Sequence, residues 1–494
     1  MCLFPPRPAG AMLAPMPPPL TEAASLAPPR IAASPRLTAL IVACALLMQN
    51  LDSTVLATAL PVMAHAYGAD PVRMSVALTS YLLSLAVFIP ASGWMADRFG
   101  ARTVFRLAII VFTLGSVLCG AAQTLGALVA ARILQGLGGA MMVPVGRLLL
   151  LRSVAKSELV AAMAWLTMPA LIGPILGPPL GGFIVSYWHW RWIFYINVPI
   201  GLLGVVLVSR YIVEVREPRP DPFDGTGLVL SALALVALMG GLELGGRGLL
   251  GPTALAATVG VGLLAGALYV RHARRHPRPV LELGLLAIPT FGVSVLAGTL
   301  FRLGVGAVPF LLPLQMQLGF GDSASKSGMI TFAAAAGALV MKPATQTLLR
   351  WIGFRATLLW NGALSAVLLA ACAAFRPAWP LAGIYAVLLV GGLVRSLQFT
   401  AYNSIAFANI PRARMSAASS LYSTLQQLSL TLGIALGAAG LELGRRVYGH
   451  ALPGPADFSL AFLLVGAASA LAAPCALLLG RDAGAELAGR GTAD

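Results

Sequence analysis

Apolar residues form long runs along most of the chain, and charged residues gather in the short gaps between them. A helix that crosses a bilayer needs about 20 predominantly apolar residues, so each run predicts one membrane-spanning helix. The expected spans are 37–64, 74–95, 103–122, 126–149, 158–185, 192–211, 226–245, 251–270, 289–317, 326–348, 355–375, 380–404, 414–440 and 458–479. The pattern therefore predicts an all-α polytopic membrane protein with fourteen transmembrane helices, the glycine-rich joint at 240–252 being the least distinct boundary.

The composition excludes a water-soluble protein. Of the 494 residues, 58% are hydrophobic and only 10% are charged, whereas soluble domains carry about 25% charged residues. The formal net charge of +16 would indicate nucleic-acid binding in a soluble protein, but here the basic residues lie between apolar runs. The lipid bilayer is therefore the expected partner, and nucleic acid is not.

The distribution of Lys and Arg predicts the orientation, because cytoplasmic loops carry these residues in excess. With the N-terminus inside, 22 of the 33 basic residues are cytoplasmic, 7 are outside and 4 lie within spans. Both termini are therefore expected in the cytoplasm. Residues 1–36 contain ten prolines and predict a disordered leader, residues 481–494 predict a cytoplasmic tail, and the basic run at 271–275 is interpreted as an anchor at the lipid surface.

A weak internal repeat divides the chain. A shift of 253 residues places Gly100 on Gly353 and Arg102 on Arg355, in the loops after the second and tenth spans. The repeat predicts two six-helix bundles, at 37–212 and 289–480, with two inserted helices and their linkers at 213–288. Parallel repeats of this kind place the substrate site near the bilayer midplane between the halves and work by alternating access.

The loop after the second span has features of a conformational latch, carried by Gly93, Asp97, Arg98, Gly100 and Arg102. Gly93 would allow two helix ends to approach closely, Asp97 would cap or pair at the next helix's N-terminus, and the arginines would pair with acids on neighbouring helix ends. The alternative, a topology anchor, explains the arginines but not the aspartate.

The fifth span carries a glycine and proline motif that comprises Gly173, Pro174, Gly177, Pro178, Gly181 and Gly182. Glycines four residues apart share one helix face and allow a partner helix to approach, whereas each proline removes a backbone donor. A bent, closely packed helix is expected. The alternative is an ordinary packing kink, but the matching stretch of the second half, residues 426–437, contains no proline.

Asp52 is the one acidic residue that the pattern places deep within a span. A carboxylate in the bilayer interior is costly and indicates a functional site by default. The functional interpretation is a proton carrier. The structural alternative is a permanent pair with a neighbour such as Arg132 of the fourth span, and the two roles can alternate between conformational states.

Four basic residues lie within spans, namely Arg132, Arg302, Lys342 and Arg395. The 253-residue shift maps Arg302 to Gln49, one helical turn from Asp52, so Arg302 and Asp52 are expected to face each other across a central cavity. Lys342 and Arg395 would either line that cavity or extend towards the cytoplasmic interface. Other candidate cavity residues are Gln49, Gln315, Tyr402, Asn403 and Gln426, although amides also join membrane helices to each other.

Several kinds of chemistry are not indicated. The chain has no phosphate-binding loop of the Gly-x-x-x-x-Gly-Lys-[Ser/Thr] type, its five cysteines form no C-x-x-C pair, and its five histidines lie near span ends or in loops. We therefore expect no metal, no cofactor and no enzymatic activity.

Four stretches together carry a family resemblance: residues 51–61, 93–102, 173–182 and 190–201. With them, the chain from about 37 to 480 resembles the fourteen-helix drug:proton antiporters of the major facilitator superfamily (EmrB/QacA type), and its C-terminal half is most similar to the MdtD branch. The resemblance implies a bacterial inner-membrane protein driven by the proton motive force. It also implies a coupling role for Arg132, and in that family the fifth-span motif marks exporters.

The leading hypothesis is an exporter that exchanges an inward-moving proton for an outgoing small molecule or drug, acting as a monomer. The excess of embedded bases favours instead an exporter of an anionic or zwitterionic metabolite, and a non-transporting sensor or assembly subunit is a third, weaker reading. Arg302→Gln is expected to separate the first two, because only anion export would collapse. The sequence leaves open whether a periplasmic adaptor and an outer-membrane channel are required.

Overall fold

The computed structural model describes residues 35–153, 173, 176–214, 222–246, 251–411, 414–480 and 483–484, and in these ranges the regular secondary structure is helical throughout. Thirteen of the described helices are long and apolar enough to cross a membrane. They coincide with thirteen of the predicted spans, most to within a few residues at each end. Most of the fifth predicted span lies outside the described residues, and its part at 176–187 is helical. The predicted leader and tail also lie almost wholly outside them.

The helices of the first half are α1 (Pro35–Tyr67), α2 (Val76–Phe88), α3 (Ser92–Phe99), α4 (Ala101–Ala121), α5 (Leu125–Ser153), the segment 176–187, α7 (Trp192–Tyr195) and α8 (Asn197–Tyr211). The inserted pair is α9 (Gly225–Gly246) and α10 (Pro252–Ala273). The second half comprises α11 (Pro289–Leu314), α12 (Ala324–Ile352), α13 (Phe354–Ala356), α14 (Gly362–Ala371), α15 (Leu381–Ile405), α16 (Met415–Tyr448), α17 (Pro455–Ala470) and α18 (Ala472–Cys475).

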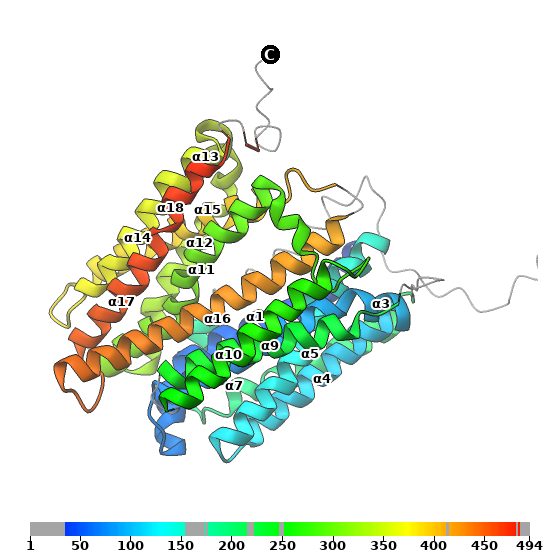
Figure 1. Ribbon diagram of the computed structural model, residues 1–494. Coiled ribbons are helices and arrows are strands. Elements are labelled where there is room, and N and C mark those ends of the chain that lie inside the picture. The colour runs from blue at the N-terminus through cyan, green and yellow to red at the C-terminus, as the bar shows by residue number, and fades with distance from the viewer. Residues whose placement is uncertain are drawn as a thin grey trace, which may run out of the picture.

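The two halves repeat one packing scheme. In the first half α2 packs on α5, α4 on α8, and α1 on α8; in the second half the equivalent helices make the same pairs, α12 on α15, α14 on α17, and α11 on α17. Figure 1 shows the two sets of helices on either side of the molecule, with α16 running between them. The predicted fold class, two six-helix bundles with two inserted helices, is confirmed.

The residues that revealed the repeat have a shared backbone role. Gly100 ends α3 and caps α4 with a φ of 94°, and Gly353 ends α12 and caps α13 with a φ of 87°. Only glycine adopts this region without steric cost. The chain therefore makes the same turn at the same place in each half.

The inserted helices form a hairpin that covers one seam between the halves. α9 and α10 pack along each other, and α9 also contacts α2 of the first half and α16 of the second. Figure 1 shows this green pair beside α16. Their outer surface is apolar, since Leu263 and Leu264 are 61% and 62% exposed, as expected of side chains that face lipid.

Candidate transport site

A buried polar cluster surrounds Asp52 of α1. Arg132 Nη1 lies 2.5 Å from Asp52 Oδ2, while Gln135 Nε2 and Asn197 Nδ2 each donate to Asp52 Oδ1 at 2.9 Å. Arg132 and Gln135 come from α5 and Asn197 from α8, and none of the four residues is more than 2% exposed. One carboxylate therefore joins three helices of the first half.

The cluster extends to a second layer of partners. Arg132 Nε donates to the carbonyl oxygen of Ala77 at 2.9 Å, and its guanidinium lies 4.3 Å from the centre of the Tyr81 ring. Ser116 of α4 accepts hydrogen bonds from both Gln135 and Asn197. The predicted pairing of Asp52 with Arg132 is present. The parts played by Ser116 and Asn197 were not predicted, and the only signal for them is a polar residue in an apolar span.

A cavity of about 190 Å³ lies between the halves. Its walls come from α1, the segment 176–187, α11, α12 and α15, and its polar lining comprises Thr54, Thr58, Thr331 and Arg395. Arg395 is the one charged residue of this lining. α1 therefore presents Thr54 and Thr58 to the cavity and Asp52 to the buried cluster.

Arg395 differs from the other embedded bases in having no partner in the described residues. Its side chain makes no hydrogen bond or ion pair with the described residues, although it is half-buried. Lys342, by contrast, donates from Nζ to Thr400 Oγ1 at 3.1 Å. Of the two alternatives considered for Arg395, lining of the cavity is the one observed.

Arg302 does not face Asp52 in this structure. It is 1% exposed and donates from Nη2 to the hydroxyl oxygen of Tyr422, with its guanidinium 4.7 Å from the Tyr422 ring centre and 5.9 Å from that of Phe399. These partners belong to the second half, whereas the partners of Asp52 all belong to the first. The expected opposition across the cavity is absent because each charge is already held within its own bundle.

The remaining predicted cavity residues also lie away from the cavity wall. Gln49 and Gln315 are buried, and Gln315 Nε2 donates to the Cys372 carbonyl oxygen at 3.2 Å. Tyr402 is buried against Phe301, with ring centres 5.7 Å apart, while Asn403 and Gln426 are half-buried. The bond of Gln315 lies within the second half, which is the structural alternative that the sequence left open.

The glycines of the fifth span pack directly on α1. A Cβ atom at Gly177 would lie 1.9 Å from Thr54 Oγ1, and one at Gly181 would lie 2.4 Å from Thr58 Oγ1; at Gly173 the nearest atoms belong to Asn50 and Leu51. The predicted shared face is therefore confirmed. Pro174, where the bend is predicted, lies outside the described residues, and Pro178 lines the cavity.

The two halves meet closely at one end of the cavity. A Cβ at Gly182 would lie 2.5 Å from the Ala324 carbonyl oxygen, and one at Gly328 would lie 2.3 Å from that of Pro178. Gln317 Nε2 donates to the carbonyl oxygen of Thr58 at 3.0 Å.

Two further polar contacts join the same ends of the halves. The Ser325 amide donates to Ser186 Oγ at 3.0 Å, and Arg445 Nη1 lies 2.7 Å from Asp70 Oδ2. In Figure 1 the bundles diverge towards the opposite ends, where α3 and α13 lie.

Arg102, one of the predicted latch residues, contacts other parts of the first half. Arg102 donates to the Ser209 carbonyl oxygen, and the amides of Arg102 and Thr103 donate to the Glu214 carboxylate at 3.0 and 3.2 Å. Glu214 thus caps α4 in the role expected of an acid at a helix N-terminus. Gly93 has open space where a Cβ would stand, so the expected close approach there is not seen, and Arg98 is exposed.

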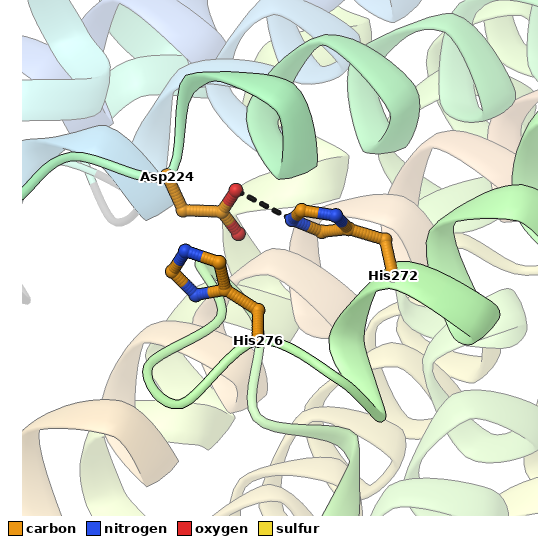
Figure 2. Close-up of side chains that lie close together, drawn as sticks. All are labelled: Asp224, His272 and His276. Atoms are coloured by element: carbon orange, nitrogen blue, oxygen red, sulfur yellow. Dashed lines mark hydrogen bonds and ion pairs between the residues drawn. The ribbon is translucent and has the colours of Figure 1, made fainter.

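A second polar cluster, not predicted, lies at the end of the inserted hairpin. Asp224, His272 and His276 place ligand-type atoms within 4.8 Å of one another, a grouping that can hold a metal ion. Figure 2 shows both imidazole rings beside the carboxylate, with His272 Nε2 2.7 Å from Asp224 Oδ1. The i, i+4 spacing of the two histidines is the signal that the sequence offers for this cluster. Nothing in the sequence links them to Asp224, which lies 48 positions before His272.

Comparison with known proteins agrees with this geometry. The sequence model of the Major Facilitator Superfamily matches residues 42–434. The chain is 38% identical over 428 residues to the MdtD protein of Pectobacterium carotovorum, named for an inferred role in multidrug resistance, with 86% of this chain and 90% of that protein covered. It is 39% identical over 410 residues to MdtD of Citrobacter koseri, with 82% and 85% covered.

Solved structures with low sequence identity share the fold. An auto-inhibited POT family peptide transporter has a TM-score of 0.67 at 16% identity, covering 93% of this chain and 97% of that one. A D-xylose–proton symporter has a TM-score of 0.63 at 14% identity, covering 89% and 96%. The matches together confirm the predicted class, a multi-pass membrane transporter rather than an enzyme. The chain belongs to the drug antiporter family of the major facilitator superfamily.

Proposed function

We propose that this protein is a secondary active exporter of the bacterial inner membrane that exchanges an inward-moving proton for an outgoing small molecule. The observation that carries the proposal is the buried Asp52 cluster. Protonation of Asp52 would remove the charge that holds Arg132, Gln135 and Asn197 together, and so would loosen α1 from α5 and α8. A carboxylate in that position is energetically costly, and its presence therefore indicates a function.

The route of coupling runs through α1. One face of this helix carries Asp52, and another lines the cavity with Thr54 and Thr58. The same helix packs on Gly177 and Gly181 with no free space between them. A change at Asp52 is therefore transmitted to the cavity wall and to the fifth span by direct contact, as alternating access between two rigid bundles requires.

We place both termini in the cytoplasm, which makes the closely packed ends periplasmic and the structure inward-facing. Contacts of Gln317 with Thr58 and of Arg445 with Asp70 support a closed outer gate. The Asp52–Arg132 pair is formed in this state, as expected after the proton has left for the cytoplasm. Both bundles and the cavity belong to one chain, so a monomer is the proposed transport unit.

A second candidate cargo class, an organic anion, is favoured by Arg395. This residue is the charged member of the cavity lining and has no partner in the part of the chain that the structure describes. An unpaired guanidinium binds a carboxylate through charge-assisted, often bidentate hydrogen bonds. Arg302, which the sequence suggested for this role, is occupied by Tyr422.

Substrate-triggered proton release from the purified protein tests the proposal. In weakly buffered detergent solution, a cargo that binds the deprotonated, inward-facing state is expected to draw protonated wild-type molecules into that state and so to release protons. Cationic dyes and organic acids are the two classes of probe. Asp52→Asn has no ionisable group at this position and is expected to release none. Release of equal size from that variant would overturn the assignment of Asp52 as the coupling acid.

A further inference from the structure

A separate pocket opens at the end of the α9–α10 hairpin, away from the transport cavity. Its volume is about 410 Å³. Its apolar wall comprises Leu230, Leu268 and Pro277, and its basic wall comprises Arg271, His272, Arg275 and His276. The pocket therefore combines a hydrophobic side with concentrated positive charge.

The basic wall is held in place by Asp224. This carboxylate is 4% exposed and accepts hydrogen bonds from the backbone amides of Gly227 and Val280, at 2.8 and 3.1 Å, besides its contact with His272. Burial raises the pKa of Asp224, but these hydrogen bonds outweigh it and leave the pKa below the ordinary value. Asp224 is thus a charged anchor that orients His272, whose ring stacks on that of His276 with centres 5.2 Å apart.

The same cluster is poorly suited to a metal ion. The oxygens of Asp224 already serve three donors, and Arg271 and Arg275 line the adjoining pocket, where they would repel a divalent cation. An anion, by contrast, would be attracted by these two arginines. Arg271 and Arg275 are exposed, and neither side chain makes a hydrogen bond or ion pair with another described residue.

We propose that this pocket binds the phosphate headgroup of an anionic phospholipid. The apolar wall decides between a lipid and a free phosphate: Leu268, which is 45% exposed, continues into the lipid-facing surface of α10 at Leu264. Acyl chains can lie along these leucines while the headgroup meets the arginines. Basic pockets between helices at the cytoplasmic surface bind anionic headgroups in this way.

The bound lipid has a defined place in the molecule. The hairpin contacts both halves through α9, and the linker that follows α10 is tied to the second half by the ion pair of Glu282 with Arg414, at 2.5 Å. A lipid in the pocket therefore holds the inserted helices against the seam between the bundles. The inference depends on insertion in a membrane and not on the identity of the cargo.

The test compares two double variants of the full-length protein. Arg271→Gln/Arg275→Gln removes the two pocket arginines, whereas Arg210→Gln/Arg274→Gln removes two exposed arginines that do not line the pocket and that we place at the same membrane surface. Binding of phosphatidylglycerol to delipidated protein is followed by native mass spectrometry and by the rise in Tm. Phosphatidylcholine, inorganic phosphate and zinc chloride serve as parallel probes.

Wild type is expected to retain phosphatidylglycerol in preference to phosphatidylcholine. The pocket variant should bind it about 25-fold more weakly, since one basic residue near the surface contributes about fivefold, and the control variant should bind as wild type does. Equal losses in both variants would overturn the proposal in favour of general surface attraction. Stabilisation by phosphate alone, or by zinc in a manner abolished by Asp224→Asn, without preferential retention of phosphatidylglycerol, would overturn it in favour of those ligands.

Discussion

The first helix of each half carries a buried charge, but the two charges have different kinds of partner. In the first half Asp52 is paired with Arg132 and receives two side-chain amides. In the second half Arg302 is held by the hydroxyl and ring of Tyr422. A carboxyl group has a neutral, protonated form, whereas a guanidinium stays charged. The comparison supports the proposal that proton coupling belongs to the first half, while the second half keeps a fixed positive charge.

The helix packing of the two halves differs in a related way. In the first half the glycines at the contact between α1 and the fifth span all lie on the fifth span, at Gly173, Gly177 and Gly181, with Gly177 the closest to α1. In the second half they are shared, since Gly306 of α11 meets the Leu430 carbonyl oxygen and Gly433 of α16 meets that of Leu303. The contact between α1 and the fifth span thus depends on glycines of one partner only, whereas α11 and α16 each contribute a glycine to theirs.

The largest effect is expected from Asp52→Asn, which removes the ionisable group of the first half. We expect proton-coupled transport in proteoliposomes to be abolished, because an amide has no proton to exchange. The variant also leaves Arg132 buried without a counter-charge, a change that costs about 3–5 kcal/mol of folding free energy. Asp52→Asn/Arg132→Gln should recover most of this stability in thermal unfolding but none of the coupling. Coupled transport by either variant would place the proton carrier elsewhere.

The next test sets Arg395 against Arg302. If the cargo is an anion, Arg395→Gln should raise the apparent KM about 10- to 100-fold, since a hydrogen bond to a charged group contributes about 1.5–3 kcal/mol. Arg302→Gln should change stability but not the preference between anionic and cationic cargo. Counterflow with an organic acid and a cationic dye measures both. A loss of apparent affinity for the anion that is confined to Arg302→Gln would instead place the cargo site at Arg302 of α11.

A third test concerns the close packing of the fifth span on α1. Gly177→Ala would place a Cβ 1.9 Å from Thr54 Oγ1, and such overpacking costs about 1–3 kcal/mol. Gly93→Ala is the matched control, since nothing lies within 4 Å of its Cβ position. We expect the first variant to lower the Tm and slow transport, and the second to keep the wild-type Tm. Equal behaviour of the two variants would contradict the close packing of the fifth span on α1.

The smallest expected effect concerns the outer gate, where the two halves touch. Asp70→Asn removes the partner of Arg445 across the seam, and a partly exposed ion pair contributes about 0.2–1 kcal/mol. The inward-facing population should fall by about 1.4- to fivefold relative to the outward-facing one. Distances between spin labels on the periplasmic ends report this ratio. Arg445→Gln added to Asp70→Asn should produce little further change if the pair acts as one contact.

The fold was largely predictable from the sequence because membrane spans are set by runs of apolar residues, which are local features. The 253-residue repeat was predictable for a local reason as well, since Gly100 and Gly353 share a positive φ. The site was less predictable. Asp52 and Arg132 stand out as charges in apolar runs, but the orientation of Arg302 depends on Tyr422, 120 positions away. The partner of His272 is Asp224, which is also distant in the chain, at 48 positions.

The α9–α10 hairpin gives the two seams between the bundles unequal freedom. At one seam α9 lies across α2 and α16, so separation there would require a whole hairpin to be displaced. At the other, Gly182 and Gly328 bring the fifth span and α12 together by backbone contact, which a small rotation breaks. If the two bundles rock against each other, the covered seam is therefore expected to act as the hinge, and the seam where the glycines meet is expected to open.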